Sequence, residues 1–93
     1  MAFRVINKTL TGGNDQLTTT HTPARGFMVW NDSANAAVIL LGDKNISATL
    51  FGYSIAKGSS TPFIAGSGPT TFNLDEVYLR GTNNDVARVI YLS

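Results

Sequence analysis

The chain has 93 residues, with seven basic and six acidic side chains that give a formal net charge of +1 at neutral pH. This length suits one small domain over 1–93, and so weak and scattered a charge argues against nucleic acid as the main partner. Cysteine is absent, which excludes disulfides and thiolate chemistry. No apolar run approaches the roughly 20 residues of a membrane span. We also find no signal-peptide pattern, and expect folding in a cytoplasm without a membrane partner.

The composition predicts strands and turns instead of helices. Glu76 and Gln16 are the only residues of their types, whereas Thr, Asn, Gly and Ser are abundant. No window of about a dozen residues combines good helix formers with apolar residues at helical spacing. We therefore expect an almost entirely β protein.

The first half of the chain contains three strand candidates and a long polar stretch. In residues 2–7, Phe3 and Val5 alternate with Arg4 and Ile6, a pattern that predicts a short strand with one buried face. Residues 8–25 hold only Leu10 and Leu17 as large apolar residues, which fits a polar loop, an irregular strand around Leu17, or an arm that becomes ordered against a partner. The segments 26–31 and 36–42 are strongly apolar and predict two buried strands joined as a hairpin.

The second half contains shorter candidates. Strands are expected at 46–52, 53–58 and 61–66, followed by a loop at 67–71 that contains Gly68 and Pro69. The segments 72–81 and 86–92 are then expected to form a final hairpin, with "GTNNDV" at 81–86 as its turn. The pattern predicts an all-β fold, a compact antiparallel β-sandwich or jelly-roll-like barrel of about eight short strands.

Asn and Asp gather in four clusters, at 12–16, 30–35, 42–45 and 81–86, and their oxygens could in principle hold calcium. None of these clusters has the twelve-residue EF-hand pattern with its final glutamate. We interpret them as turn residues that satisfy backbone groups at strand ends, and predict no metal and no cofactor. A calcium site assembled from several loops stays open.

The residues needed for catalysis are sparse. His21 is the only histidine, so a multi-histidine zinc site is excluded, and no serine lies in a G-x-S-x-G context. The neighbouring carboxylates Asp75 and Glu76 would point to opposite faces of a strand. We expect His21 on the surface and no enzymatic activity.

The aromatic residues are expected mainly in the core, because a small β domain needs large apolar side chains there. Tyr53 lies in a less apolar stretch and is the aromatic residue that we would first expect to find exposed. The aromatic residues considered are Trp30, Phe51, Tyr53, Phe63, Tyr78 and Tyr91.

Three stretches carry a resemblance to a known class of proteins: "VINKTLTGGNDQLT", "PARGFMVWNDSANAAVILLGDKNISAT" and "FNLDEVYLRGTNNDVARVIYLS". Their arrangement resembles the small β-sandwich structural proteins encoded beside capsid genes in tailed bacteriophages. It covers most of the chain and includes no catalytic motif. The resemblance implies a virion component, a capsid decoration or cement protein that binds the major capsid protein in many copies, often as a homotrimer.

The resemblance also directs attention to residues that would contact a partner. The polar segment 8–25 is the candidate, and its alternative is an ordinary surface loop. Phe3, Arg4 and Arg25 are the expected anchors, with Leu10, Leu17 and His21 beside them. Two other functions stay open: a tail or fibre component that binds a host glycan, and a free-standing binding module unconnected with virions.

Overall fold

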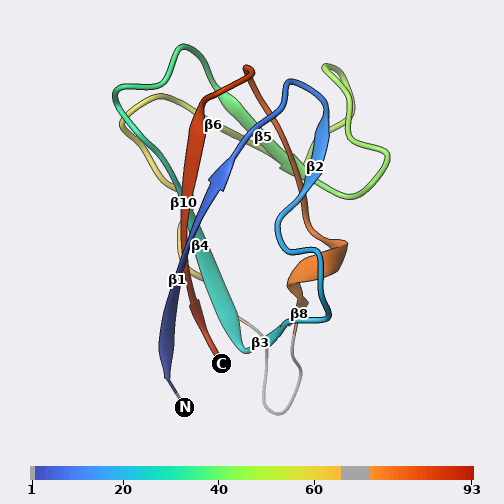
Figure 1. Ribbon diagram of the computed structural model, residues 1–93, viewed down its shortest axis with the longest axis vertical. Coiled ribbons are helices and arrows are strands. Elements are labelled where there is room, and N and C mark those ends of the chain that lie inside the picture. The colour runs from blue at the N-terminus through green and yellow to red at the C-terminus, as the bar shows by residue number, and fades with distance from the viewer. Residues whose placement is uncertain (1, 66–71) are drawn as a thin grey trace.

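The computed structural model describes residues 2–65 and 72–93, so the loop predicted at 67–71 lies outside the described residues (Figure 1). Within those ranges the fold is nearly all β, as predicted, with ten short strands instead of about eight and one short 3₁₀ helix. No described helix is long and apolar enough to cross a membrane. The elements are β1 (Phe3–Thr9), β2 (Asn14–Gln16), β3 (Pro23–Ala24), β4 (Gly26–Asn31), β5 (Ile39–Gly42), β6 (Tyr53–Ile55), β7 (Ile64–Ala65), β8 (Phe72–Asn73), η1 (Leu74–Glu76), β9 (Tyr78–Arg80) and β10 (Val86–Leu92).

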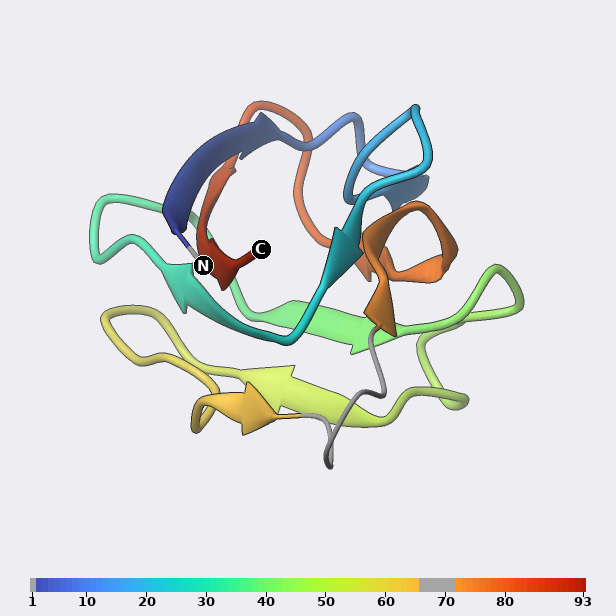
Figure 2. The same cartoon turned by 90° about the horizontal axis from the view of Figure 1, so that it is seen from below.

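The strands form two four-stranded sheets and one short ribbon. The first sheet has the order β1-β10-β4-β7, the second has the order β2-β9-β5-β6, and β3 pairs with β8. All of these pairings are antiparallel. Figure 2 shows the strands arranged around a common centre, which the core side chains fill. This arrangement is consistent with the predicted small β-sandwich.

The buried apolar side chains form one cluster between the two sheets. Alternate residues of each strand point inward because successive side chains of a strand point to opposite faces. Each large aliphatic side chain buried in this way contributes about 1.5–3 kcal/mol to the free energy of folding. The cluster consists of Leu10, Leu17, Ala24, Phe27, Val29, Ile39, Leu41, Ile55, Leu74, Leu79, Ala87 and Val89.

The chain passes from one sheet to the other at the upper end of the molecule in Figure 1, in the connections β1 to β2, β4 to β5, β6 to β7 and β9 to β10. The two predicted hairpins are therefore wrong. The segment 26–31 becomes β4 of the first sheet, while 36–42 yields only β5 of the second sheet. The strands β9 and β10 likewise belong to different sheets, so "GTNNDV" connects the two layers.

A buried asparagine explains why the chain leaves the first sheet after β4. The side chain of Asn31 has no solvent exposure. Its Nδ2 donates hydrogen bonds to the carbonyl oxygens of Ala37, at 3.0 Å, and Ile55, at 2.8 Å. Its Oδ1 accepts a hydrogen bond of 2.7 Å from Nδ2 of Asn35. Because these partners lie on the crossing and on β6, Asn31 fixes the path between the sheets.

Asp85 and Asn35 tie the last crossing to this one. The carboxylate of Asp85 accepts hydrogen bonds from the backbone N–H groups of Ala36, at 2.9 Å, and Ala37, at 3.3 Å. Asn35 accepts a hydrogen bond from the N–H of Val86 and donates one to its carbonyl oxygen. The interpretation of the clusters at 30–35 and 81–86 as turn residues that satisfy backbone groups is thus confirmed.

One residue of "GTNNDV" has a left-handed backbone. Asn84 has a φ of 73°, the only positive φ among the described residues other than glycine. Asparagine tolerates this region better than most residues, which explains its place in a tight connection.

The segment 8–25 is folded into the domain and is not a detached arm. It contains the end of β1, the strands β2 and β3, and two core residues, Leu10 and Leu17, each only 1% exposed. The N–H of Leu10 donates to the carbonyl oxygen of Asp85, and that of Leu17 to the carbonyl oxygen of Val77, both at 2.8 Å. The two leucines therefore anchor an otherwise polar stretch to the core.

Several other predicted strands are shorter or absent among the described residues. The segment 46–52 forms no strand, although Ile46 is buried. The segments 53–58 and 61–66 yield only the short strands β6 and β7, and 72–81 is interrupted by η1. The interruption places Leu74 in the core with no solvent exposure.

The two ends of the chain meet at the lower end of the first sheet (Figure 1). The N–H of Ser93 donates a hydrogen bond of 2.9 Å to the carbonyl oxygen of Ala2, which continues the ladder between β1 and β10.

Candidate partner-binding surface

The face of the first sheet that points away from the core is apolar. The odd-numbered residues of β4 and β10, such as Val29 and Val89, lie in the core, so their even-numbered neighbours point outward. The register sets the outward residues of β1, β10 and β4 in rows across the sheet. We call this surface the outer face; it consists of Phe3, Val5, Met28, Trp30, Arg88, Ile90 and Leu92.

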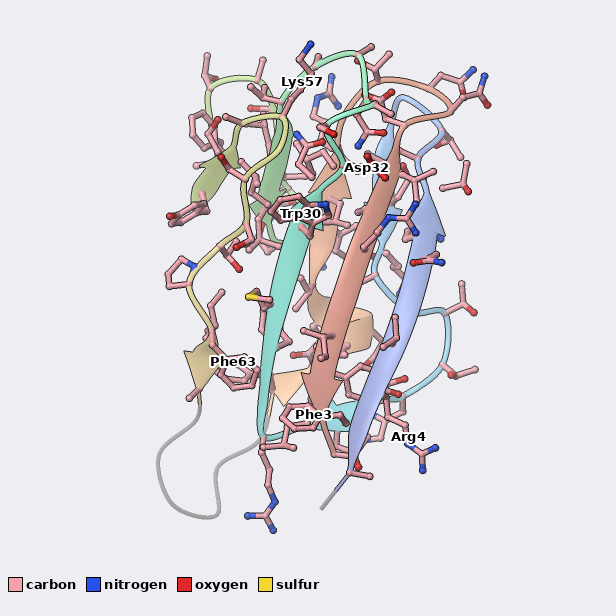
Figure 3. The ribbon with its side chains drawn as sticks, turned by 90° about the vertical axis from the view of Figure 1, so that its left-hand side faces the viewer. Phe3, Arg4, Trp30, Asp32, Lys57 and Phe63 are labelled. Atoms are coloured by element: carbon pink, nitrogen blue, oxygen red, sulfur yellow. The ribbon has the colours of Figure 1, made fainter. Side chains whose placement is uncertain are left out.

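Several side chains of the outer face are unusually exposed for their type. Val5 is 71% exposed, Phe3 is 68% exposed and Trp30 is 37% exposed. The middle row joins Val5, Ile90 and Met28, which line a shallow depression of about 170 Å³ together with Trp30 and other residues. Figure 3 views this side of the molecule, with Trp30 over β4 and Phe3 toward the lower end of the sheet. Contiguous exposed apolar side chains typically mark an interaction site.

An ion pair closes the upper end of the outer face. The guanidinium of Arg88 contacts Oδ2 of Asp32 through Nη2 and Nε, each at 3.0 Å. The backbone N–H of Ala34 also donates to Oδ1 of Asp32 at 3.0 Å. This N–H group first, and Arg88 second, lower the pKa of the Asp32 carboxyl below its ordinary value of 3.8. The pair therefore keeps its charges at neutral pH beside Trp30, which lies opposite Arg88 in the register.

Phe63 lies at the opposite, lower end, next to β7 (Figure 3). It is 43% exposed, and its ring approaches Gly26 closely. A Cβ atom at position 26 would lie only 2.5 Å from Cε1 of Phe63. Glycine at position 26 is therefore what lets Phe63 cover this corner of the sheet.

The structure places the six predicted contact residues in different environments. Phe3 and Arg4 are exposed neighbours on β1, as a contact role requires. Leu10 and Leu17 are buried in the core, so their predicted partner contacts are corrected to a structural role. A polar stretch in a small domain still has to supply core side chains, and these two are its only large apolar residues.

The other two predicted residues, His21 and Arg25, are both exposed and lie in different connections between strands. His21 lies on the surface, as expected, with Nδ1 3.6 Å from Oδ1 of Asp75. Arg25 is exposed between β3 and β4, and its backbone N–H donates to the carbonyl oxygen of Leu92 at 2.7 Å. Since Leu92 lies opposite Phe3, Arg25 is at the same end of the sheet as Phe3 and Arg4.

Most of the outer face was not predicted from the sequence. Val5 lies in a strand for which one buried face was expected, and Met28 lies in one that was expected to be buried on both sides. An antiparallel sheet in so small a domain has a partner layer on only one side, and this signal could have identified them. The expectation that Trp30, Phe51 and Phe63 pack in the core is wrong, because all three are exposed, whereas the expected exposure of Tyr53 is confirmed.

Two further surfaces lie outside the outer face. One is a depression of about 320 Å³ lined by Asp43, Lys44, Asp75, Glu76 and Tyr78. Among the described residues, no group of three or more His, Cys, Asp or Glu side chains lies close enough together to hold a metal ion. The other is a smaller apolar group, Leu50, Phe51 and Tyr53, at the start of β6 in the second sheet.

No family model, curated protein or solved structure matches this chain. The candidate surface is therefore argued from the geometry and chemistry of its own residues.

Proposed function

We propose that this chain is a structural protein of a tailed-bacteriophage virion, a capsid decoration protein. In this proposal it binds the major capsid protein on the outside of the head and stabilises the shell. The outer face supplies the contact, with Phe3 at its lower end and with Arg4 and Arg25 at the same end of the sheet. The proposal extends the resemblance of the three stretches quoted above, which carry no catalytic motif.

The observation that carries the proposal is the exposed apolar outer face on a small domain of low net charge. Exposure of apolar side chains such as Val5 and Phe3 to water is unfavourable, so a surface that keeps them exposed is suited to burial against a partner. A contact of modest area is sufficient for a decoration protein, because repetition on a symmetric lattice multiplies weak affinities.

A homotrimer is part of the proposal. The second apolar group, Leu50, Phe51 and Tyr53, belongs to the other sheet and is separate from the outer face in sequence and strand pairing. Two apolar surfaces suit a protein that contacts both its own copies and a shell. Self-association also adds stability to a domain whose hydrophobic core is as small as this one.

The proposed role is binding without catalysis, and nucleic acid and membranes are not proposed as partners. The basic residues are scattered singly along the chain, which gives no continuous positive stripe for a phosphate backbone.

The test is the ratio of this chain to the major capsid protein in purified particles. Hundreds of copies per particle are expected, whereas a handful would point to the tail and none would end the virion proposal. A double variant, Phe3→Ser with Val5→Ser, should fold but be depleted from particles. The matched control is Asn7→Ser with Thr9→Ser, on the same strand and face, which should be incorporated normally.

One alternative is favoured by a specific observation. Trp30 and Tyr53 are exposed aromatic side chains, and a tail or fibre protein could stack a host glycan on them. Saccharide binding on an array that Trp30→Ala abolishes would support this alternative. A monomer in solution that is absent from particles would instead support a free-standing binding module.

A further inference from the structure

The strand β1 forms an open edge of the first sheet. It is the outermost strand in the order β1-β10-β4-β7 and has seven residues, whereas β7 at the opposite edge has two. Its register with β10 is continuous from Phe3 to Thr9, without a bulge, and it contains no proline. Natural edge strands are usually shortened, bulged, covered or protected by charged side chains, and on β1 only the charges of Arg4 and Lys8 offer such protection.

The hydrogen bonds at the two ends of β1 show which backbone groups are free. Ser93 donates to the carbonyl oxygen of Ala2, and Leu10 donates to that of Asp85, so even-numbered residues of β1 bond to β10. In an antiparallel strand, alternate residues direct both backbone groups to opposite sides. The odd-numbered residues Phe3, Val5 and Asn7 therefore direct their N–H and C=O groups toward the open edge.

The same residues direct their side chains onto the outer face. Phe3 and Val5 are the two most exposed large apolar residues among those described. No hydrogen bond between described residues outside the regular strand pairing uses a backbone group of Phe3, Val5 or Asn7. An added strand would thus gain backbone hydrogen bonds and apolar contacts from the same positions, as in recognition by β-strand addition.

The charges on β1 indicate the chemistry of the segment that would add. Arg4 and Lys8 flank Ile6 on the other face of the strand, and neither forms an ion pair with a described residue. Figure 3 shows Arg4 extending away from the edge of the sheet. An incoming strand with acidic side chains opposite Arg4 and Lys8 would satisfy both charges.

The same charges disfavour a second copy of β1 as the occupant. Two copies can exchange the free backbone groups only if odd-numbered residues lie opposite odd-numbered residues. The registers centred on β1 then place Arg4 opposite Lys8, or Arg4 diagonal to Arg4, or Lys8 diagonal to Lys8. Like charges at such positions are destabilising, so the edge selects a different, acidic strand.

We propose that the β1 edge binds an extended acidic segment of the shell protein, which adds as a fifth strand antiparallel to β1. The segment carries acidic residues at two positions four apart, which face Arg4 and Lys8. Apolar residues opposite Phe3 and Val5 extend the outer face. This inference rests on the proposed function only for the identity of the protein that supplies the segment.

The first experiment uses a synthetic peptide, Thr-Glu-Thr-Val-Val-Glu-Leu, whose glutamates face Lys8 and Arg4 in the antiparallel register. Binding to the purified chain is measured by fluorescence polarisation and by NMR shifts of the amides of Phe3, Val5 and Asn7. A peptide with lysine in place of both glutamates should bind at least about tenfold more weakly, since two attractive pairs become repulsive.

Backbone methylation separates strand addition from simple charge attraction. The third and fifth peptide N–H groups face the edge, and the fourth faces away. Methylation of the third and fifth should abolish binding, whereas methylation of the fourth should leave it within about twofold. Equal binding of the two methylated peptides would overturn the proposal.

Variants of the chain provide a reciprocal test. Arg4→Glu with Lys8→Glu should reverse the preference, so that the lysine peptide binds better than the glutamate peptide. Val5→Pro removes one free N–H without touching the ladder to β10, since edge strands tolerate proline at such positions. It should abolish binding, while Val5→Thr, which keeps the N–H, should weaken it only a few-fold. Thermal melting verifies that each variant is folded.

The outcomes of this test are distinguishable from those of the particle count. A high copy number with no peptide binding would refute the strand-addition mode and leave the decoration role intact. Specific peptide binding with no copies in particles would do the reverse. If Val5→Pro instead dissociates an oligomer of the chain, the edge is occupied by a second copy and the proposal fails.

Discussion

Two regions of the molecule differ in how polar and apolar side chains are distributed: the end where the chain crosses between the sheets, and the outer face. Where the chain crosses between sheets, polar side chains such as Asn31 and Asp85 are buried and fully engaged. On the outer face, apolar side chains such as Phe3 and Val5 are exposed and contact little. The usual partition of polar outside and apolar inside is reversed in both places. The crossing end thus determines the topology, and the outer face is available for recognition.

The buried polar groups at the crossing end are stable because each has a partner. An unpaired amide in the interior costs several kcal/mol, whereas a satisfied network makes one arrangement of the chain much better than its competitors. Asn31 and Asn35 together bond to the nearby residue Ala37 and to two segments that are distant in sequence, at Ile55 and Val86.

Replacing Asn31 should have the largest effect. Asn31→Ala removes the side-chain partner of the carbonyl oxygens of Ala37 and Ile55, and one of the two acceptors of Nδ2 of Asn35. We expect a loss of about 3–5 kcal/mol in the free energy of unfolding, because each buried unsatisfied group costs about 1–3 kcal/mol. Urea denaturation followed by circular dichroism measures this loss. Asn7→Ala, on the exposed face of β1, is the control and should change stability by less than about 0.5 kcal/mol.

Truncation of Leu17 should separate core residues from contact residues within the predicted set. Leu17→Ala opens a cavity at a 1% exposed position and should lower the free energy of unfolding by about 2–5 kcal/mol. Phe3→Ala should change it by less than about 1 kcal/mol, since Phe3 is 68% exposed, but should weaken partner binding. Thermal melting combined with particle incorporation tests both. Equal destabilisation by the two substitutions would contradict the assignment of Phe3 to a contact surface.

Acid titration should reveal the ion pair at the upper end of the outer face. The pKa of Asp32 is lowered in the folded protein, so the unfolded chain takes up the proton first as the pH falls. The contribution of Asp32 is therefore complete above its ordinary value of 3.8 and is lost as the pH falls through the lower folded value. Melting temperatures of the unaltered protein and Asp32→Asn should differ slightly at pH 7 and converge in acid. A gap that widens in acid would refute this sign.

The composition was sufficient to predict the all-β class, and the order of apolar residues along the chain was sufficient to predict the position of several strands. The segments 26–31 and 86–92 contain enough β-branched and aromatic residues to favour strands in any partner arrangement. The strand pairing was not predictable in the same way. A short polar link such as "DSAN" is compatible with a hairpin, and only the long-range hydrogen bonds of Asn31 and Asn35 select the crossing.

The candidate site was predicted only in part, for a related reason. Phe3 and Arg4 were selected as anchors and are exposed, whereas Leu10 and Leu17 were selected because they stood out in a polar stretch. Prominence in sequence does not distinguish a contact residue from a core residue. That distinction depends on which face of each strand meets the other sheet, and the pairing that decides it is not encoded locally.

The meeting of the two chain ends has a mechanical consequence. Ala2 and Ser93 terminate neighbouring antiparallel strands at the same end of the sheet. Tension applied between the termini would therefore open the β1–β10 ladder one hydrogen bond at a time, like a zipper, instead of shearing all of its bonds together. Load transmitted through the sheet faces would leave that ladder closed. A fusion tethered at both ends would be the weakest way to hold this protein under force.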